Sequence, residues 1–185
     1  MASSFSPEDY YLRAIGQFTV AFSRLETFIA ESIREFITDE YELAERITAD
    51  MEFVQLVYLL KSLVKYRISD KASQKKFLSL IDKLFGINTT RVQYIHADWF
   101  LPHDDTKKPA ILIKKSKRAK KGWDSDSKEK MLSEIFDSTH KIWFACNELT
   151  AIMEANRTTI KEHRAKNANR TATMITLEKL KALTK

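Results

Sequence analysis

The chain has 185 residues, of which 44% are hydrophobic and 30% charged, a balance typical of one globular domain and not of a disordered chain. Its three glycines and three prolines favour long helices and exclude a β-sandwich or a Gly-rich phosphate-binding fold. The net charge is +6, and the one cysteine (Cys146) cannot form an intrachain disulfide. The sequence shows neither a secretion signal nor a run of about 18 apolar residues. We therefore expect a cytoplasmic protein that contacts no membrane.

A long amphipathic helix is predicted over residues 7–37. It begins at Ser6-Pro7-Glu8-Asp9 (SPED), which combines a hydroxyl cap, a proline in the first turn and acids near the positive end of the helix dipole. Apolar residues then recur at every third or fourth position, which is the spacing of one helix face. Gly16 costs this helix about 1 kcal/mol relative to alanine. The close approach of another backbone would account for the glycine.

Two shorter helices are predicted next. The first covers residues 41–47. The second follows a cap at Asp50 and carries an apolar stripe over residues 53–64.

A third long helical segment is predicted from Lys71 onward. The stretch 86–90 (GINTT) is poor helix material, so it predicts a kink or a restart of the helix. Helix is then expected to resume over residues 91–100 and to stop at Pro102, because the residue before a proline disfavours the helical conformation.

The helical period disappears between residues 101 and 127. The apolar run 110–113 (AILI) is rich in β-branched residues and predicts a strand, and residues 121–123 (KGW) could form the return of a small two-stranded hairpin.

The last main helix is predicted to begin near Ser127. Its expected inward positions are Met131, Leu132, Ile135, Phe136, Ile142, Trp143, Cys146, Leu149 and Met153. Beyond Asn156 the chain becomes polar and basic, and the pattern leaves open whether this tail is helical or frayed.

These elements predict a mainly α fold, an up-down helical bundle of four to five helices with a small β-hairpin or loop insertion. Residues 1–156 would form the helical domain, with residues 101–127 as a basic insertion, and residues 157–185 a basic C-terminal tail. We find no internal repeat.

Positive charge is concentrated in two stretches. Residues 107–121 carry eight Lys or Arg and no acid, and residues 157–185 carry eight against two acids. Such a basic arm suits a polyanionic partner such as RNA, although a solvated charge run that aids solubility is the alternative. The candidate contacts are Lys114, Lys115, Lys117, Arg118, Lys120 and Lys121, with Trp123 for base stacking.

Arg91 and His96 form the candidate catalytic pair. On one helix they would diverge by about 140°, on either side of an apolar stripe of Val92, Ile95 and Trp99. If that stripe packs against a second copy, both side chains lie at the rim of the interface, where two copies build one site. A histidine can take the proton of an RNA 2′-hydroxyl or protonate the leaving oxygen, while an arginine neutralises the phosphate. No metal is needed, because the nucleophile belongs to the RNA.

The stretch 91–99 (RVQYIHADW) resembles the Arg-x4–6-His signature of the HEPN superfamily, especially the branch with Trp three residues after the histidine. Residues 15–26 resemble the opening helix of its abortive-infection members. The resemblance covers roughly residues 11–153, and its specific part is about nine residues. The resemblance implies a helical bundle of HEPN type and a homodimeric, metal-independent endoribonuclease that needs no cofactor. Such an enzyme would belong to the toxin or antiviral defence class. Its expected partners are RNA and an antitoxin or defence-system protein. Arg91 and His96 would be catalytic, and the product a 2′,3′-cyclic phosphate. The supporting residues would be Asn88, Gln93, Tyr94 and Asp98.

The motif departs from the family pattern at two positions. Val92 replaces a residue that is usually polar, and Ala97 one that is often glycine. The alternative function is therefore a catalytically inactive HEPN-like module that binds nucleic acid or a partner protein.

Other chemistries find less support. Two histidines and three carboxylates between His96 and Asp105 have ligand types that suit Zn²⁺ or Mn²⁺, but a polar helix exit is the favoured interpretation, and no metal is expected. Cys146 lies on an apolar stripe, which predicts an inert buried thiol. Trp99 and Trp143 are predicted to be core residues.

Overall fold

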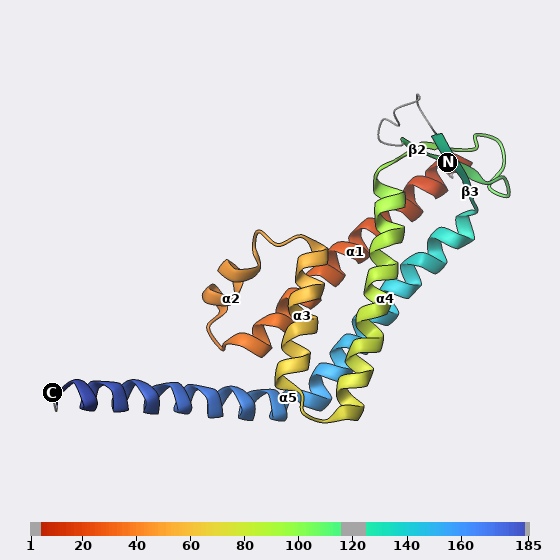
Figure 1. The fold of residues 1–185 in the computed structure, drawn as a ribbon. Helices are drawn as coiled ribbons and strands as arrows, with labels where there is room; N and C mark the ends of the chain where they lie inside the picture. The colour runs from red at the N-terminus through yellow and green to blue at the C-terminus, as the bar shows by residue number, and fades with distance from the viewer. Residues whose placement is uncertain (1–4, 116–124, 184–185) are drawn as a thin grey trace. The chain divides into compact units, whose positions relative to one another are not determined.

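The computed structural model describes residues 5–115 and 125–183, and the side chains of these residues except for 114–126 and 168–183. This part of the chain contains five helices and a small three-stranded antiparallel sheet, so the mainly α prediction is confirmed (Figure 1). The elements are α1 (Pro7–Ile37), α2 (Tyr41–Thr48), α3 (Phe53–Arg67), α4 (Lys71–Ile95), β1 (Ala97–Phe100), β2 (Ala110–Lys115), β3 (Ser125–Lys130) and α5 (Leu132–Leu183).

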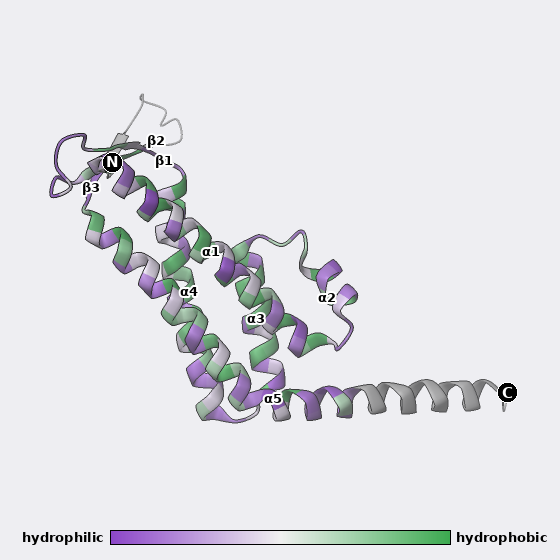
Figure 2. Cartoon of the chain, turned by 180° about the vertical axis from the view of Figure 1, so that it is seen from behind, coloured by the Kyte–Doolittle hydropathy of each residue, from purple (hydrophilic) through white to green (hydrophobic). Residues whose placement is uncertain are grey.

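The chain folds into two compact units. The first unit comprises Met1–Thr27 and Asp82–Asn147, and the second unit comprises Phe28–Ile81 and Glu148–Lys185. Patches of hydrophobic and of hydrophilic residues follow one another along the helices, as expected of amphipathic helices (Figure 2). Within the described ranges, no helix is both long and apolar enough to cross a membrane.

Helix α1 has the predicted bounds. A reciprocal pair of hydrogen bonds caps it: the Ser6 N–H donates to the Asp9 carboxylate at 2.8 Å, and the Asp9 N–H donates to Ser6 Oγ at 3.2 Å. These bonds with Ser6 lower the pKa of Asp9. Apart from the adjacent backbone of α1 itself, no described atom lies within 4 Å of the position that a Cβ on Gly16 would occupy, so the close approach of another backbone does not account for this glycine.

The core of the first unit gathers around Tyr94. Its ring meets the ring of Phe18 edge to face, with 4.9 Å between the centroids, and both side chains are buried. Tyr11 is also buried, and its hydroxyl donates to the carbonyl of Lys108 at 2.8 Å. The start of α1 thereby holds the loop before β2.

The core of the second unit is built on Phe36 and Phe77, whose ring centroids are 6.0 Å apart. Helix α3 begins after a capping box in which the Glu52 N–H donates to Gln55 Oε1 at 2.8 Å. The N-cap is therefore Glu52 and not the predicted Asp50. Glu52 can form a capping box because Gln55 stands three residues later.

Helix α4 runs without interruption from Lys71 to Ile95, so a restart of the helix at residues 86–90, one of the two predicted alternatives, is wrong. The hydroxyls of Thr89 and Thr90 donate to carbonyls one turn earlier, at 3.0 and 3.3 Å. Leu84 and Ile87 are buried on this helix. Burial of the apolar face outweighs the weak helix propensity of the sequence there.

Helix α4 ends at Ile95, so the predicted helix over residues 91–100 is wrong in its second half. Residues 97–100 instead form β1, paired with β2. The indole N–H of Trp99 donates at 2.8 Å to the carbonyl of Tyr94, one of the last carbonyls of α4. Trp99 folds back onto the end of the helix and is half-buried there.

The sheet has the strand order β1-β2-β3. The predicted strand at residues 110–113 is confirmed as part of β2, where Ala110 and Leu112 are buried and Ile111 is exposed. Its second partner is β3, which is polar throughout and was predicted to be loop and helix. The predicted return at residues 121–123 lies outside the described residues.

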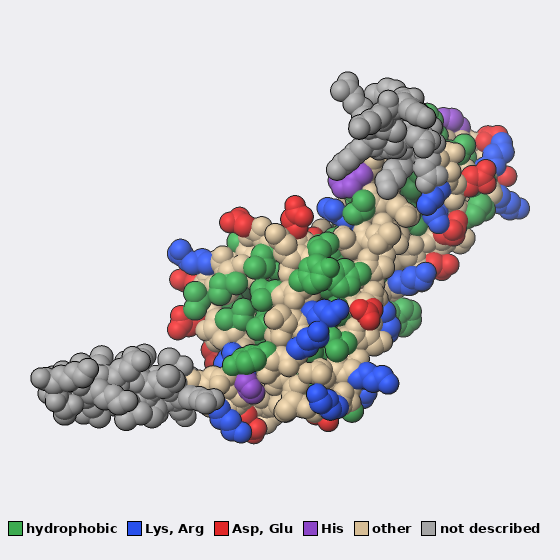
Figure 3. Space-filling view, viewed as in Figure 1, with side chains coloured by type: hydrophobic (Ala, Val, Ile, Leu, Met, Phe, Trp, Pro, Cys, Tyr) green, Lys and Arg blue, Asp and Glu red, His purple; other side chains and the backbone are tan. Residues whose placement is uncertain are grey.

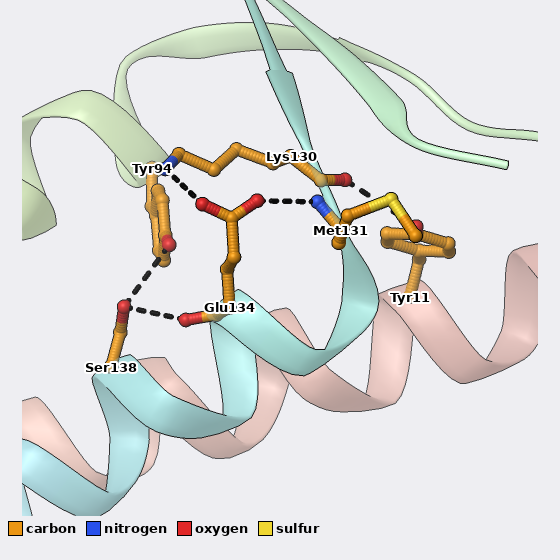
Figure 4. Close-up of polar contacts among 6 residues, drawn as sticks. All are labelled: Tyr11, Tyr94, Lys130, Met131, Glu134 and Ser138. Atoms are coloured by element: carbon orange, nitrogen blue, oxygen red, sulfur yellow. Dashed lines mark hydrogen bonds and ion pairs between the residues drawn. The ribbon is translucent and has the colours of Figure 1, made fainter. Parts of the chain in front are cut away.

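Helix α5 begins at Leu132 and not near Ser127. The Glu134 carboxylate accepts the Met131 N–H at 2.8 Å and pairs with Lys130 Nζ at 2.9 Å, which defines the start of the helix (Figure 4). The Lys130 bond, and then the Met131 bond, lower the pKa of Glu134. The helix continues past Asn156 to Leu183.

The inward face predicted for α5 is confirmed in part. Ile135, Cys146, Leu149 and Met153 are buried, as expected. Met131 is 38% exposed and Trp143 is 42% exposed, so their placement in the core was wrong. Helical spacing marks both residues as belonging near the apolar face, but the neighbouring elements do not cover them.

Candidate functional site

Arg91 lies near the end of α4 and is half-buried against α1. Its guanidinium carbon lies 5.5 Å from the centroid of the Phe22 ring, within cation–π range. The Glu26 carboxylate also interacts with Arg91 electrostatically. The guanidinium is therefore positioned by an aromatic ring and an acid from the same helix.

Burial raises the pKa of Glu26, and the nearby charge of Arg91 opposes part of that rise. The folded chain consequently holds this proton more tightly than the unfolded chain, and the contribution of Glu26 to stability falls as the pH rises through its pKa. Sequence reasoning did not link Phe22 and Glu26 to Arg91. Their i,i+4 spacing places both on one face of α1, but it does not indicate which distant residue they meet.

His96 lies in a bend directly after α4 and is exposed. Its backbone N–H donates to the carbonyl of Val92 at 3.3 Å. In the described part of the chain, the imidazole forms no hydrogen bond or ion pair. Because His96 lies outside the helix, the 140° divergence from Arg91 expected on one continuous helix does not apply.

The apolar stripe beside Arg91 is only partly as predicted. Val92 and Ile95 are 36% and 38% exposed, so they form an open apolar strip at the end of α4. Trp99 does not continue this strip, because it belongs to β1 and bonds back to Tyr94.

The supporting residues separate into different environments. Tyr94 is buried, and its hydroxyl lies 3.1 Å from Ser138 Oγ, so it anchors the end of α4 from inside the core (Figure 4). Asn88 is half-buried and stands three residues before Arg91, on the same helix face. Gln93 stands two residues after Arg91, which is about 200° around the helix. Asp98 is exposed on β1.

The sheet brings part of the basic segment beside His96. In the β1–β2 register Ala97 lies opposite Lys114, so the backbone of the basic end of β2 runs alongside the residue that follows His96. Lys115 lies opposite Ser125 in the β2–β3 pair. The side chains of Lys114 and Lys115, and the candidates Lys117, Arg118, Lys120, Lys121 and Trp123, lie outside the described part.

The described side chains around His96 form no metal site. His103 pairs with Glu8 at 3.3 Å, and Asp104 pairs with Lys108. Among the side chains that the structure describes, no group of three or more His, Cys, Asp or Glu is placed to hold a metal ion.

Cys146 is buried, as predicted. Burial, the largest effect, raises the pKa of its thiol to about 11. The thiolate that nucleophilic catalysis requires is therefore scarce near neutral pH.

The comparisons with known proteins give no relative from which a function could be carried over: no family model matches this chain, and no curated protein or solved structure matches it.

Proposed function

We propose that this chain is a metal-independent endoribonuclease of the HEPN type that acts as a homodimer in the cytoplasm. The observation that carries the proposal is the β1–β2 register, which brings the basic end of β2 alongside the residue after an exposed histidine. The Arg91–His96 spacing and the half-buried, oriented guanidinium of Arg91 add to it. In the cell, the enzyme would act as a toxin or in defence against phage.

The reaction is a transesterification within the RNA strand. The 2′-oxygen attacks the adjacent phosphorus while His96 of one copy takes the proton of the 2′-hydroxyl. The bond from phosphorus to the 5′-oxygen breaks, and the second copy's His96 gives a proton to that oxygen. Arg91 holds the non-bridging oxygens as negative charge builds on them. The products are a 2′,3′-cyclic phosphate and a free 5′-hydroxyl.

A second copy would supply what one chain lacks. One chain has one histidine at this site, whereas base and acid catalysis in a single step needs two proton-transfer groups. Val92 and Ile95 form an exposed apolar strip next to Arg91. A two-fold contact through this strip would bring both pairs to one interface.

The first experiment measures cleavage of a fluorescently labelled RNA by the purified chain in excess EDTA. We expect cleavage by the wild type and loss of about 100-fold or more in both Arg91→Ala and His96→Gln. Mass spectrometry should find products lighter by one water than the 3′-monophosphate. His103→Gln is the matched control, because it removes another exposed imidazole of the same unit. Cleavage that survives in both motif variants would refute the catalytic assignment.

A second experiment tests the composite site through the apolar strip. Val92→Asp with Ile95→Asp should convert a dimer to a monomer in light scattering, and cleavage should fall with it. Val20→Asp is the control, since Val20 is also an exposed valine of this unit, at 68%. A monomeric wild type that cleaves RNA would contradict the shared site.

The second candidate function is a catalytically inactive HEPN-like module that binds a partner protein, such as an antitoxin or a defence subunit. The observation that favours it is a gathering of hydrophobic side chains over α2 and α3 (Figure 3). The exposed ones on these helices are Tyr41, Leu43, Tyr58 and Tyr66. Such a patch is typical of a protein contact surface. Absence of cleavage by the dimer, together with tight capture of one partner through this patch, would favour this function.

A further inference from the structure

The second unit contains a basic pocket, formed by the last turn of α1, residues 38–39 and residues 157–164 of α5. Its volume is about 250 Å³. Four cationic and two acidic side chains line it: Arg34, Glu35, Asp39, Arg157, Lys161 and Arg164. The three cations of α5 are spaced i, i+4, i+7 and therefore share one helix face.

Two of the cations are paired within the pocket. Arg157 donates through Nε and one terminal nitrogen to the two Glu35 oxygens, each at 3.4 Å. Arg164 donates to the Glu35 backbone carbonyl at 3.0 Å and to the Asp39 carboxylate. The pKa of Asp39 is lowered, first by its bond with Arg164 and further by the charges of Arg164 and Lys161. Both carboxylates of the pocket are thus engaged by arginines.

The other two cations have no carboxylate partner among the described residues. Arg34 lies over the Tyr41 ring, with its guanidinium carbon 5.2 Å from the ring centroid. The buried Nε of Arg34 has no hydrogen-bond acceptor among the described residues. Lys161 is exposed and acts on Asp39 through charge alone. The pocket therefore carries two positive charges beyond its acids. A donor left without an acceptor is unfavourable, and a bound anion would reduce the uncompensated charge.

We propose that this basic pocket binds a diphosphate group, free or carried by a nucleotide. Arginine presents rigid, permanently charged donors that match phosphate oxygens, and lysine adds a point charge. An excess of two positive charges complements a diphosphate, and the volume accommodates a small anion and not a folded macromolecule. The inference is independent of the proposed ribonuclease activity, which involves other residues.

The test is isothermal titration of the full chain with sodium pyrophosphate and, separately, with ADP, at constant ionic strength. We expect one site per chain, and at least tenfold weaker binding in Arg34→Gln and in Lys161→Gln. Lys166→Gln is the matched control, because it removes an exposed cation of the same helix outside the pocket. Thermal unfolding of each variant establishes that it is folded.

Each outcome decides the proposal. Equal binding of both ligands identifies the diphosphate itself as the recognised group, and tighter binding of ADP identifies a nucleotide as its source. No binding by the wild type, undiminished binding by Lys161→Gln, or equal weakening by Lys166→Gln would overturn it. Binding of an RNA oligonucleotide with no binding of either small ligand would also overturn it. If a glutamine variant is unfolded, Arg34→Lys and Lys161→Met replace it in the same titration.

Discussion

The two units use arginine in different ways. In the first unit, Arg91 stands against one aromatic ring and one acid, close in sequence to an exposed histidine. In the second unit, four cations share a pocket with two acids, and no histidine lines it. Proton transfer needs a group that titrates near neutral pH and is open to solvent, whereas anion binding needs fixed charge. We therefore propose chemistry for the first unit and anion recognition for the second.

The largest expected effect separates the two units directly. His96→Gln should lower RNA cleavage by about 100-fold or more, the usual contribution of a general acid or base. The same variant should bind pyrophosphate as the wild type does, because His96 belongs to the other unit. Cleavage assays and titration calorimetry on one preparation give both values. Loss of both properties would indicate unfolding and break the proposed division of roles.

The cores of the two units can be compared by truncation. Phe18→Ala in the first unit and Phe77→Ala in the second each remove a fully buried ring, and each should lower the free energy of unfolding by about 3–5 kcal/mol. All three tryptophans fall in the sequence range of the first unit, so their fluorescence reports on that unit, whereas circular dichroism reports on all helices. Because α1, α4 and α5 contribute to both units, we expect the two signals to shift together in denaturant titrations. A Phe77→Ala transition seen only by circular dichroism would show that the units unfold separately.

In the first unit, burial makes the thiol of Cys146 unreactive, whereas His96 is exposed. The pKa of Cys146 is about 11 instead of the ordinary 9.0, so the thiolate fraction near pH 8 falls about 100-fold. Iodoacetamide should therefore alkylate the native chain at least about 100-fold more slowly than the unfolded chain, as followed by mass spectrometry. Similar rates in the two states would place Cys146 in an open environment.

The smallest expected effect concerns a helical glycine of the first unit. Gly16→Ala should raise the free energy of unfolding by up to about 1 kcal/mol, because a methyl group at this position meets no described atom within 4 Å other than the adjacent backbone of its own helix. Gly86→Ala has the same free space and serves as a matched comparison in the same denaturant titration. A loss of stability in Gly16→Ala alone would indicate that another surface covers this position.

Local patterns predicted the long helices because their apolar residues repeat at helical spacing. Helix α1 has its predicted bounds, since a strong cap and an unbroken stripe specify the same element. The strand at Ala110 was recognisable from its β-branched run. The polar strand β3 was not, because its pairing with β2 depends on a partner and not on its own composition.

The candidate site was predictable only as residue types. Arg91 and His96 were singled out by their spacing together with the resemblance of residues 91–99 to a family signature, but their surroundings could not be predicted. The ring of Phe22 and the carboxylate of Glu26 reach Arg91 from a helix some 65 residues earlier in the sequence. No local pattern reports contacts over such a separation.

The amino-acid sequence alone determined the mainly helical class, the extent of α1 and the choice of Arg91 and His96, because periodicity and motif spacing are local properties. Tertiary structure alone decided that α4 continues through Gly86 and stops at Ile95, and that Trp143 is left uncovered. It also assembled the basic pocket, in which Arg34 meets three cations more than 120 residues away. These outcomes depend on which distant surfaces pack together, since burial and pairing between elements outweigh the preferences of any short segment.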